Sequence, residues 1–158
     1  MRTSEVVAGR RILVVLHSGD DVIASLAEAC RRHGVAQAAV TTFSGAFRRA
    51  RLIAASEPPL DPEVPLPDSV EVAYTEGVGS GTVTADEAGG HAVHIHVALG
   101  AKDRSGRAVA GHLLAGEAHY VIEIVLEEIL APRLVRRPHP DSHGIAILDV
   151  DDAAESRR

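Results

Sequence analysis

Residues 91–99 read HAVHIHVAL and alternate between two kinds of side chain. Successive side chains of an extended strand point to opposite faces of a sheet. One face of this stretch is therefore aliphatic and consists of Val93, Ile95, Val97 and Leu99. The other face carries His94 and His96 between alanines, with the two rings roughly 6.5–7 Å apart along the strand. The pattern predicts a strand that covers the core with its aliphatic face and presents two imidazoles on the other.

A third histidine lies on the next expected strand, residues 107–114, RAVAGHLL. A hairpin folded near Asp103 brings His112 opposite His94 or His96, with Cβ atoms about 4.5–5.5 Å apart. The sequence leaves the register open, because a slip of one residue sends His112 to the other face. In the favourable register, three imidazoles converge in a pocket lined by alanines.

Three imidazoles with an open position are typical of catalytic zinc sites, whereas structural zinc normally has four protein ligands. Nickel, copper and iron also bind imidazole, so zinc is the preferred ion among several. Glu117 and Glu123 share a face of the following segment, 117–129. They are the candidates to hydrogen-bond the ligating rings or to move protons. The alternative interpretation is that these histidines only decorate a solvated face of the sheet.

One helix is expected within residues 18–34, SGDDVIASLAEACRRHG. Ser18 and Asp21 have the spacing of a capping box at its start, and Gly34 can end it. Cys30, the only cysteine, falls on the apolar side of this helix, which indicates a position in the core.

Strand patterns account for most of the remaining chain: residues 10–17, 35–43, 48–56, 69–77, 80–86, 91–99, 107–114, 117–129 and 145–150. The proline-rich segment 57–67 is expected to be a loop, because proline cannot donate to a β-ladder. The sequence predicts an α+β fold, with a mostly antiparallel sheet and one main helix packed on it. We expect a single domain over residues 1–158, with its core at about 10–130 and a C-terminal strand and tail at 131–158.

The chain has 158 residues and a net charge of −6. An acidic domain repels a phosphate backbone, so nucleic-acid binding would need a local basic patch. The basic clusters are Arg48, Arg49 and Arg51 in one segment and Arg133, Arg136 and Arg137 in another. Aromatic side chains for base stacking are scarce, which favours solvated strand edges for these arginines. The single cysteine, with no recognisable leader and no apolar run of bilayer length, predicts a cytoplasmic protein without membrane association.

Residues 94–129 read HIHVALGAKDRSGRAVAGHLLAGEAHYVIEIVLEEI. They contain a His-x-His strand, a Leu-Gly turn, a Gly-His-Leu strand and a closing strand that ends in Leu-Glu-Glu. Residues 16–52 contain a strand, a helix and a Ser-Gly-Ala turn in that order. Together these features resemble the plants-and-prokaryotes conserved (PPC) domain family over about residues 10–130.

The resemblance implies an α+β fold, commonly a homotrimer, with a metal held at His94, His96 and His112. The fold is also similar to that of acetolactate decarboxylases, which use a zinc held by three histidines. In plants the domain accompanies AT-hook motifs and acts in nuclear DNA binding, whereas bacterial relatives stand alone. Residues 104–107, RSGR, lack the Arg-Gly-Arg-Pro core of an AT-hook.

Three functions are compatible with these features. The first, which the family resemblance favours, is a metal-binding regulatory module that contacts DNA or another protein. The second is a zinc-dependent enzyme of lyase, decarboxylase or hydrolytic type that acts on a small oxygenated metabolite bound at the metal. In the third, the metal only stabilises the fold.

Overall fold

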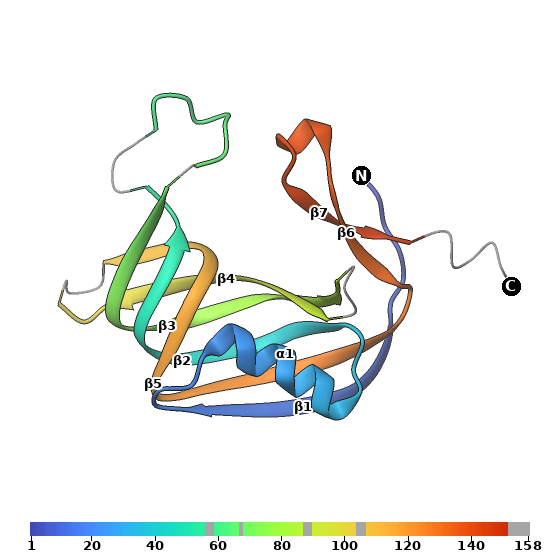
Figure 1. The fold of residues 1–158 in the computed structure, drawn as a ribbon, viewed down its shortest axis with the longest axis horizontal. Helices are drawn as coiled ribbons and strands as arrows, with labels where there is room; N and C mark the ends of the chain where they lie inside the picture. Colours follow the sequence, from blue (N-terminus) through green and yellow to red (C-terminus); the bar gives the residue numbers. More distant parts are fainter. Residues whose placement is uncertain (56–58, 67, 87–89, 104–106, 152–158) are drawn as a thin grey trace, which may run out of the picture.

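The computed structural model describes residues 1–55, 59–66, 68–86, 90–103 and 107–151 (Figure 1). The elements follow the order β1 (Val7–His17), α1 (Val22–His33), β2 (Ala38–Ile53), β3 (Ser69–Ala85), β4 (His91–Ala101), β5 (Ala108–Ala131), β6 (Leu134–Pro138), the short 3₁₀ helix η1 (Pro140–Ser142) and β7 (Ala146–Val150). Strands dominate and one α-helix packs on them, which confirms the expected α+β class. The tip of the hairpin expected near Asp103, with most of the RSGR segment, lies outside the described residues.

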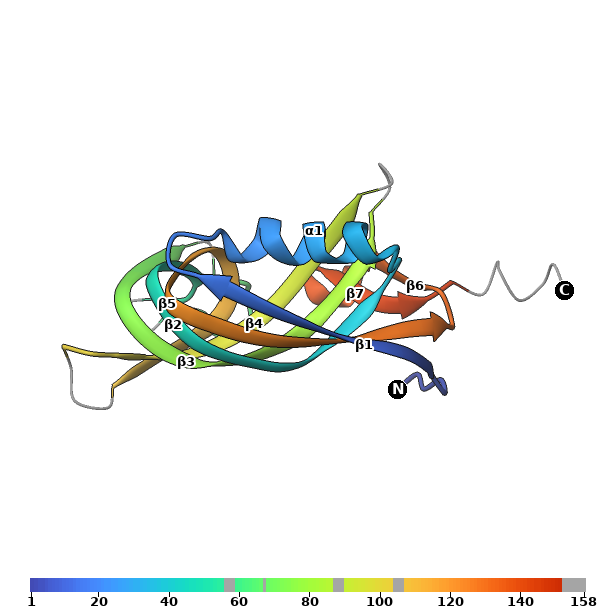
Figure 2. The same cartoon turned by 90° about the horizontal axis from the view of Figure 1, so that it is seen from below.

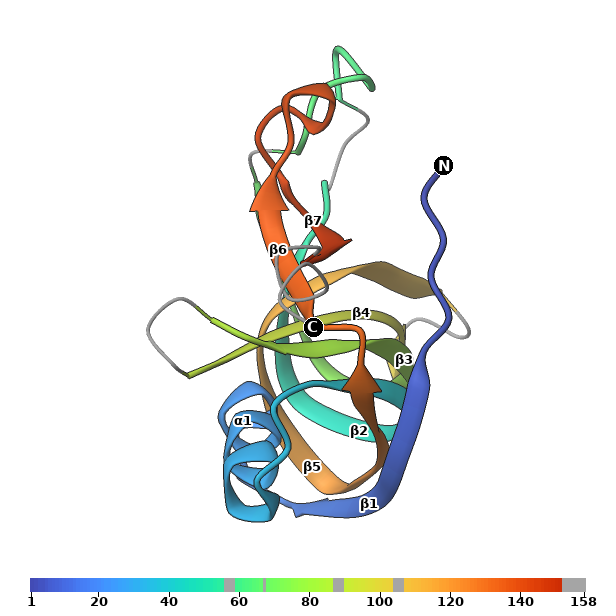
Figure 3. The ribbon, with the colours of Figure 1, turned by 90° about the vertical axis from the view of Figure 1, so that its right-hand side faces the viewer.

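The main sheet has five antiparallel strands in the order β1-β5-β2-β3-β4, and β4 also pairs with β5. This additional pairing closes β5, β2, β3 and β4 into a ring, and Figure 3 shows the curl of the sheet from one end. The 24 residues of β5 make the closure possible. Residues 108–112 of β5 pair with β4 and residues 121–131 with β1, whereas β2 pairs with β5 over residues 112–128. One strand thus connects the histidine region to the opposite end of the sheet.

The helix α1 lies along one side of the sheet (Figure 2), where it contacts β1, β4 and β5. Its buried side chains are Val22, Leu26 and Cys30, which belong to the aliphatic core. The core position expected for Cys30 is therefore confirmed, and burial raises the pKa of its thiol to about 11. No helix in the described ranges has the length and apolar character that a membrane span requires.

The start of the helix differs from the predicted capping box. The N-cap is Asp21, whose carboxylate accepts a hydrogen bond from the Ala24 amide at 2.8 Å. The Ser18 hydroxyl instead accepts a hydrogen bond from Arg48 on β2. The end of the helix agrees with the prediction, because Gly34 adopts a left-handed φ of 64° as its C-cap.

Several strands that the sequence predicts as pairs are continuous in the structure. The segments at 35–43 and 48–56 merge into β2, those at 69–77 and 80–86 into β3, and those at 107–114 and 117–129 into β5. Gly45 illustrates the physical reason. It has a φ of 155° at a register shift between β2 and β5, and a Cβ there would collide with the β5 backbone. The Ser44-Gly45 pair is therefore a bulge that bends a continuous strand, where the sequence predicts a turn.

Strands β6 and β7 form a separate two-stranded antiparallel sheet, which follows the end of β5 (Figure 1). The strand expected at 145–150 corresponds to β7. The sequence predicts no strand at 134–138, so β6 is an addition from the structure. Its position proves to matter for the histidine cluster.

Candidate metal centre

Strand β4 separates the core from a polar face, as its sequence predicts. Ile95, Val97 and Leu99 are all buried in the core. On the opposite face, His94 is half-buried and His96 is exposed. Strand alternation alone therefore places both imidazoles outside the core.

The register between β4 and β5 brings the third imidazole to the same place. His96 and His112 are direct partners in the antiparallel ladder, which decides between the two pairings that the sequence leaves open. Ring centroids are 5.1 Å apart for His94 and His96, 4.5 Å for His94 and His112, and 5.5 Å for His96 and His112. One ring nitrogen of each residue lies within 4.8 Å of the other two. The three histidines are thus arranged so that they could hold one metal ion.

The donor set fits a borderline transition metal. A tetrahedral zinc with Zn–N bonds of about 2.0–2.1 Å places its ligand nitrogens roughly 3.3 Å apart. The ring nitrogens, which lie within 4.8 Å of one another, would adopt that spacing around a bound ion. Within the described residues, the group contains imidazoles only, with no carboxylate or thiolate. Magnesium and calcium prefer oxygen ligands, so this set favours zinc, nickel, copper or iron.

Two of the imidazoles are held in the neutral form that a metal ligand needs. Burial, then the charge of Arg136, then the neighbouring rings lower the pKa of His94 to about 4. Burial also lowers the pKa of His112, with smaller contributions from His96 and Arg136. In addition, His112 Nδ1 is buried and has no hydrogen-bond partner among the residues described. A nitrogen lone pair without another partner is available for coordination.

A shallow hollow of about 390 Å³ adjoins His96. Small side chains contribute much of its lining, among them Ser80, Ala98 and Ala110. It contains two of the alanines expected around the imidazoles, but of the three histidines only His96 lines it. A small molecule can therefore approach His96 from this side.

The two acidic residues proposed from the sequence do not join the histidine group. The Glu117 carboxylate is bound by Arg48 Nε at 3.0 Å and by Arg49 Nη2 at 2.7 Å. Glu123 is exposed, further along β5. A role for either residue as a hydrogen-bond partner of the rings or as a proton carrier stays a prediction.

Arg136, on β6, is the residue near this cluster that sequence reasoning misses. Its Nη2 donates a hydrogen bond to Thr82 Oγ1 at 2.9 Å, and Thr82 lies opposite His94 in the β3–β4 ladder. The sequence predicts a solvated arginine here, but the side chain is half-buried, and burial lowers its pKa. Strand alternation along residues 134–138, LVRRP, could have predicted this difference. It sends Arg136 and Arg137 to opposite faces of the strand.

Several solved structures share this fold. A plant- and prokaryote-conserved (PPC) protein from Pyrococcus horikoshii is 22% identical with a TM-score of 0.75, covering 96% of this chain and 99% of that chain. A metal-containing protein from Archaeoglobus fulgidus is 22% identical with a TM-score of 0.73, covering 93% and 98%. A candidate DNA-binding protein from Ralstonia eutropha JMP134 is 20% identical with a TM-score of 0.71, covering 88% and 90%. Among curated proteins, none matches this chain.

The family model of the Plants and Prokaryotes Conserved (PCC) domain matches residues 3–130. This range includes α1, β1 to β4, nearly all of β5 and the three clustered histidines, and it stops before β6. The match agrees with the resemblance of the two long sequence stretches and with the shared fold. The chain therefore belongs to the Plants and Prokaryotes Conserved domain family.

Proposed function

We propose that this protein binds a divalent transition metal, with zinc preferred, through His94, His96 and His112. The observation that carries the proposal is the convergence of three ring nitrogens within 4.8 Å of one another. Three protein ligands leave at least one coordination position for a small molecule. The hollow beside His96 is where such a molecule would approach one of the three ligands.

The test is elemental analysis of protein purified without a metal-affinity tag, followed by zinc titration of the chelated protein. We expect close to one ion per chain in the native protein and none in a His94→Ala variant. A matched control is His33→Ala, which changes an exposed histidine at the end of α1. Equal metal content in all three proteins would place the ion elsewhere and overturn the proposal.

A metal with an open position supplies Lewis acidity toward an oxygen atom of a bound ligand. We therefore propose, as the alternative to a regulatory role, an enzyme of lyase, decarboxylase or hydrolytic type that acts on a small oxygenated metabolite. Glu123 is the better candidate for proton transfer, because arginines already bind the Glu117 carboxylate. Turnover of a 2-hydroxy- or 2-keto-acid by metal-replete protein, lost in Glu123→Gln, would support this role.

DNA binding is the second candidate function, suggested by the fold shared with the Ralstonia eutropha protein. Arg48 and Arg49 pair with Glu117, and this pairing leaves less positive charge for a phosphate backbone. If a regulatory module of this kind binds duplex DNA, affinity falls steeply as salt rises. Fluorescence anisotropy at about 50 mM salt is the appropriate measurement, and no binding there excludes this function.

We further propose that the protein assembles as a homotrimer through the outer face of its sheet. Ladder partners place Val15, Glu123, Ser44, Val78 and Ala98 in one row across the five strands. All five residues are exposed, and Val78 keeps 59% of its surface accessible. Val78 and Ala98 adjoin in this row as exposed apolar side chains, and contiguous exposed apolar surface marks sites of association.

Light scattering tests the assembly. We expect a mass three times that of the 16.6 kDa chain, reduced to one chain by Val78→Glu. The control Val64→Glu introduces the same charge at an exposed position outside the sheet. A monomeric native protein would overturn this part of the proposal.

A further inference from the structure

Arg136 is fixed beside the histidine cluster by contacts at both ends of its guanidinium. Nη2 donates to Thr82 Oγ1 at 2.9 Å, and Nη1 donates to the Ala146 carbonyl at 3.3 Å on β7. Thr82 is the ladder partner of His94. The charge of the guanidinium also contributes to the lowered pKa of both His94 and His112. The guanidinium is therefore held close to the point where the imidazoles converge.

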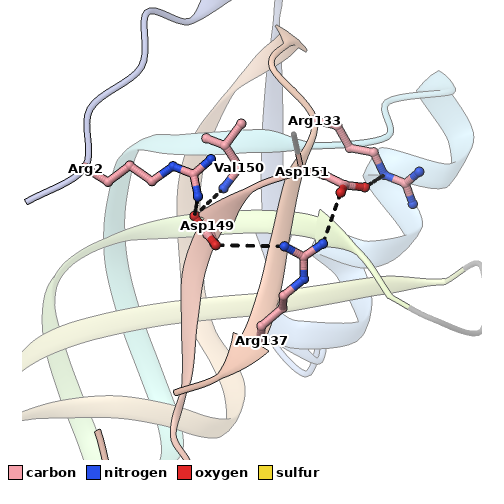
Figure 4. Close-up of polar contacts among 6 residues, drawn as sticks. All are labelled: Arg2, Arg133, Arg137, Asp149, Val150 and Asp151. Carbon is pink, nitrogen blue, oxygen red and sulfur yellow. Dashed lines mark hydrogen bonds and ion pairs between the residues drawn. The ribbon is translucent and has the colours of Figure 1, made fainter. Parts of the chain in front are cut away.

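Arg133 and Arg137, the two arginines nearest to Arg136 in the sequence, form ion pairs with aspartates (Figure 4). Arg137 Nη2 lies 3.0 Å from Asp151 Oδ1, and Arg133 Nε lies 3.9 Å from Asp151 Oδ2. Arg137 also reaches Asp149, with Nη1 3.9 Å from Oδ2. These arginines have their charge balanced by aspartates of the same C-terminal segment.

Arg136 forms no ion pair of this kind within the described residues. No carboxylate of the described residues lies within ion-pair distance of its guanidinium, and its buried Nε has no hydrogen-bond partner among them. The neighbouring imidazoles are acceptors or metal ligands and carry no negative charge. A divalent metal at the three rings would add two further positive charges to this region. Unbalanced positive charge of this kind attracts an anion.

We propose that the three-histidine centre takes a small oxyanion, a carboxylate or a phosphate, with one oxygen on the metal and the anionic group held by Arg136. This inference rests on the proposed metal centre and names the chemical class of its ligand. The planar guanidinium suits carboxylate and phosphate because its N–H groups form a fork that matches two oxygens. Nε is one N–H of that fork for which the described residues offer no acceptor, and a metal held by three histidines would keep a coordination position for the other end of the ligand.

A purely structural role for Arg136 makes a different prediction. In that case the residue only fastens the β6–β7 sheet to β3 through Thr82. Its replacement would then lower the melting temperature without any effect on anion binding. The two roles are distinguished by measuring the ligand directly.

The experiment uses the full chain loaded with cobalt(II), whose visible absorption changes when a ligand enters its coordination sphere. The probes are lactate, inorganic phosphate and lactamide, the last being a neutral molecule of nearly the same shape as lactate. We expect lactate or phosphate to shift the spectrum with saturation, and lactamide to bind at least about tenfold more weakly. Comparison of the two anions shows whether the centre prefers a carboxylate or a phosphate.

Arg136→Gln keeps a donor for Thr82 and removes the charge, whereas Arg137→Gln changes the neighbouring aspartate-paired residue. We expect Arg136→Gln to weaken anion binding by about 10- to 100-fold and Arg137→Gln to leave it unchanged. Metal affinity should stay the same or rise in Arg136→Gln, because a positive charge beside the ion has been removed.

The outcomes separate the two proposals. If the native protein binds no metal, the metal centre is wrong and the anion site falls with it. Two other results would overturn the anion site and leave the metal centre standing. In the first, metal binds at the histidines but lactate and lactamide bind equally. In the second, Arg136→Gln binds the anion as tightly as the native protein does.

Discussion

Strand β5 carries two polar clusters that lie five residues apart in sequence, at His112 and at Glu117. At Glu117, one carboxylate is held by two guanidinium groups, from Arg48 and Arg49. At His112, three imidazoles meet with Arg136 nearby, and no carboxylate of the described residues belongs to the group. The first cluster pairs its opposite charges among its own members, although Arg48 Nε, 3.0 Å from the Glu117 carboxylate, is also buried without a hydrogen bond among the described residues. The second has a buried ring nitrogen and a buried guanidinium nitrogen that lack partners in the described part of the chain.

From this difference we infer that the cluster at Glu117 is structural, whereas the cluster at His112 is the proposed binding site. Polar groups that are removed from water cost free energy unless a partner replaces the water. The arginines pair their charges with Glu117, so no further ion is needed there. In the function proposed above, a metal and an anion would provide the missing partners of the histidine cluster. Loss of a residue should therefore affect binding at one cluster and folding stability at the other.

The largest effect is expected for His96→Ala. Loss of one of three ligands should weaken zinc binding by more than about 100-fold, beyond the usual cost of altering an outer partner of a ligand. Glu117→Gln should leave zinc affinity within about twofold, as expected for a residue that touches no ligand. Calorimetric titration of the chelated proteins measures both affinities. Similar losses in the two variants would remove the distinction between the clusters.

A stability effect of intermediate size is expected from pH. His94 has a pKa of about 4 in the folded, metal-free protein and about 6.5 when unfolded. Because the folded state favours the neutral ring, its contribution is fully present above pH 6.5 and is lost as the pH falls toward 4. After allowance for solvent screening, we expect a loss of about 1–2 kcal/mol, or about 3–6 °C in Tm.

Thermal unfolding in chelator at pH 7 and pH 4.5 checks this prediction, with His94→Gln as the reference. The variant lacks the titrating ring, so its Tm should fall less than that of the native protein over the same interval. Other acidic groups titrate equally in both proteins and cancel in the comparison. An identical fall in the two proteins would show that His94 is not held neutral by the fold.

The smallest effect is expected for Glu117→Gln on stability. The substitution leaves Arg48 and Arg49 without their carboxylate, but all three side chains retain contact with solvent. We expect the free energy of unfolding to fall by up to about 1 kcal/mol, or about 2–4 °C in Tm. The loss should shrink at high salt, because exposed charges are screened. A fall in metal content in place of this small destabilisation would instead support the role at the metal that the sequence suggests for Glu117.

Local patterns determined much of the fold and of the site. The alternation in residues 91–99 predicts correctly which side chains of β4 face the core and which carry the imidazoles. The apolar spacing and Gly34 predict the helix and its end. These features depend on periods of two and about 3.6 residues, so they can be read from neighbours in the chain.

Tertiary structure decided the features that depend on pairing between distant segments. The ladder fixes His96 opposite His112, and the fold brings Arg136 from β6 to Thr82, 54 residues away in sequence. The same pairings make β2 continuous through Gly45 and leave Glu117 with two arginines. Register and long-range contacts are selected by the packing of the whole sheet, because a local sequence is compatible with several of them. The sequence thus determined which residues are available for the candidate metal centre, and the closed sheet decided which of them meet.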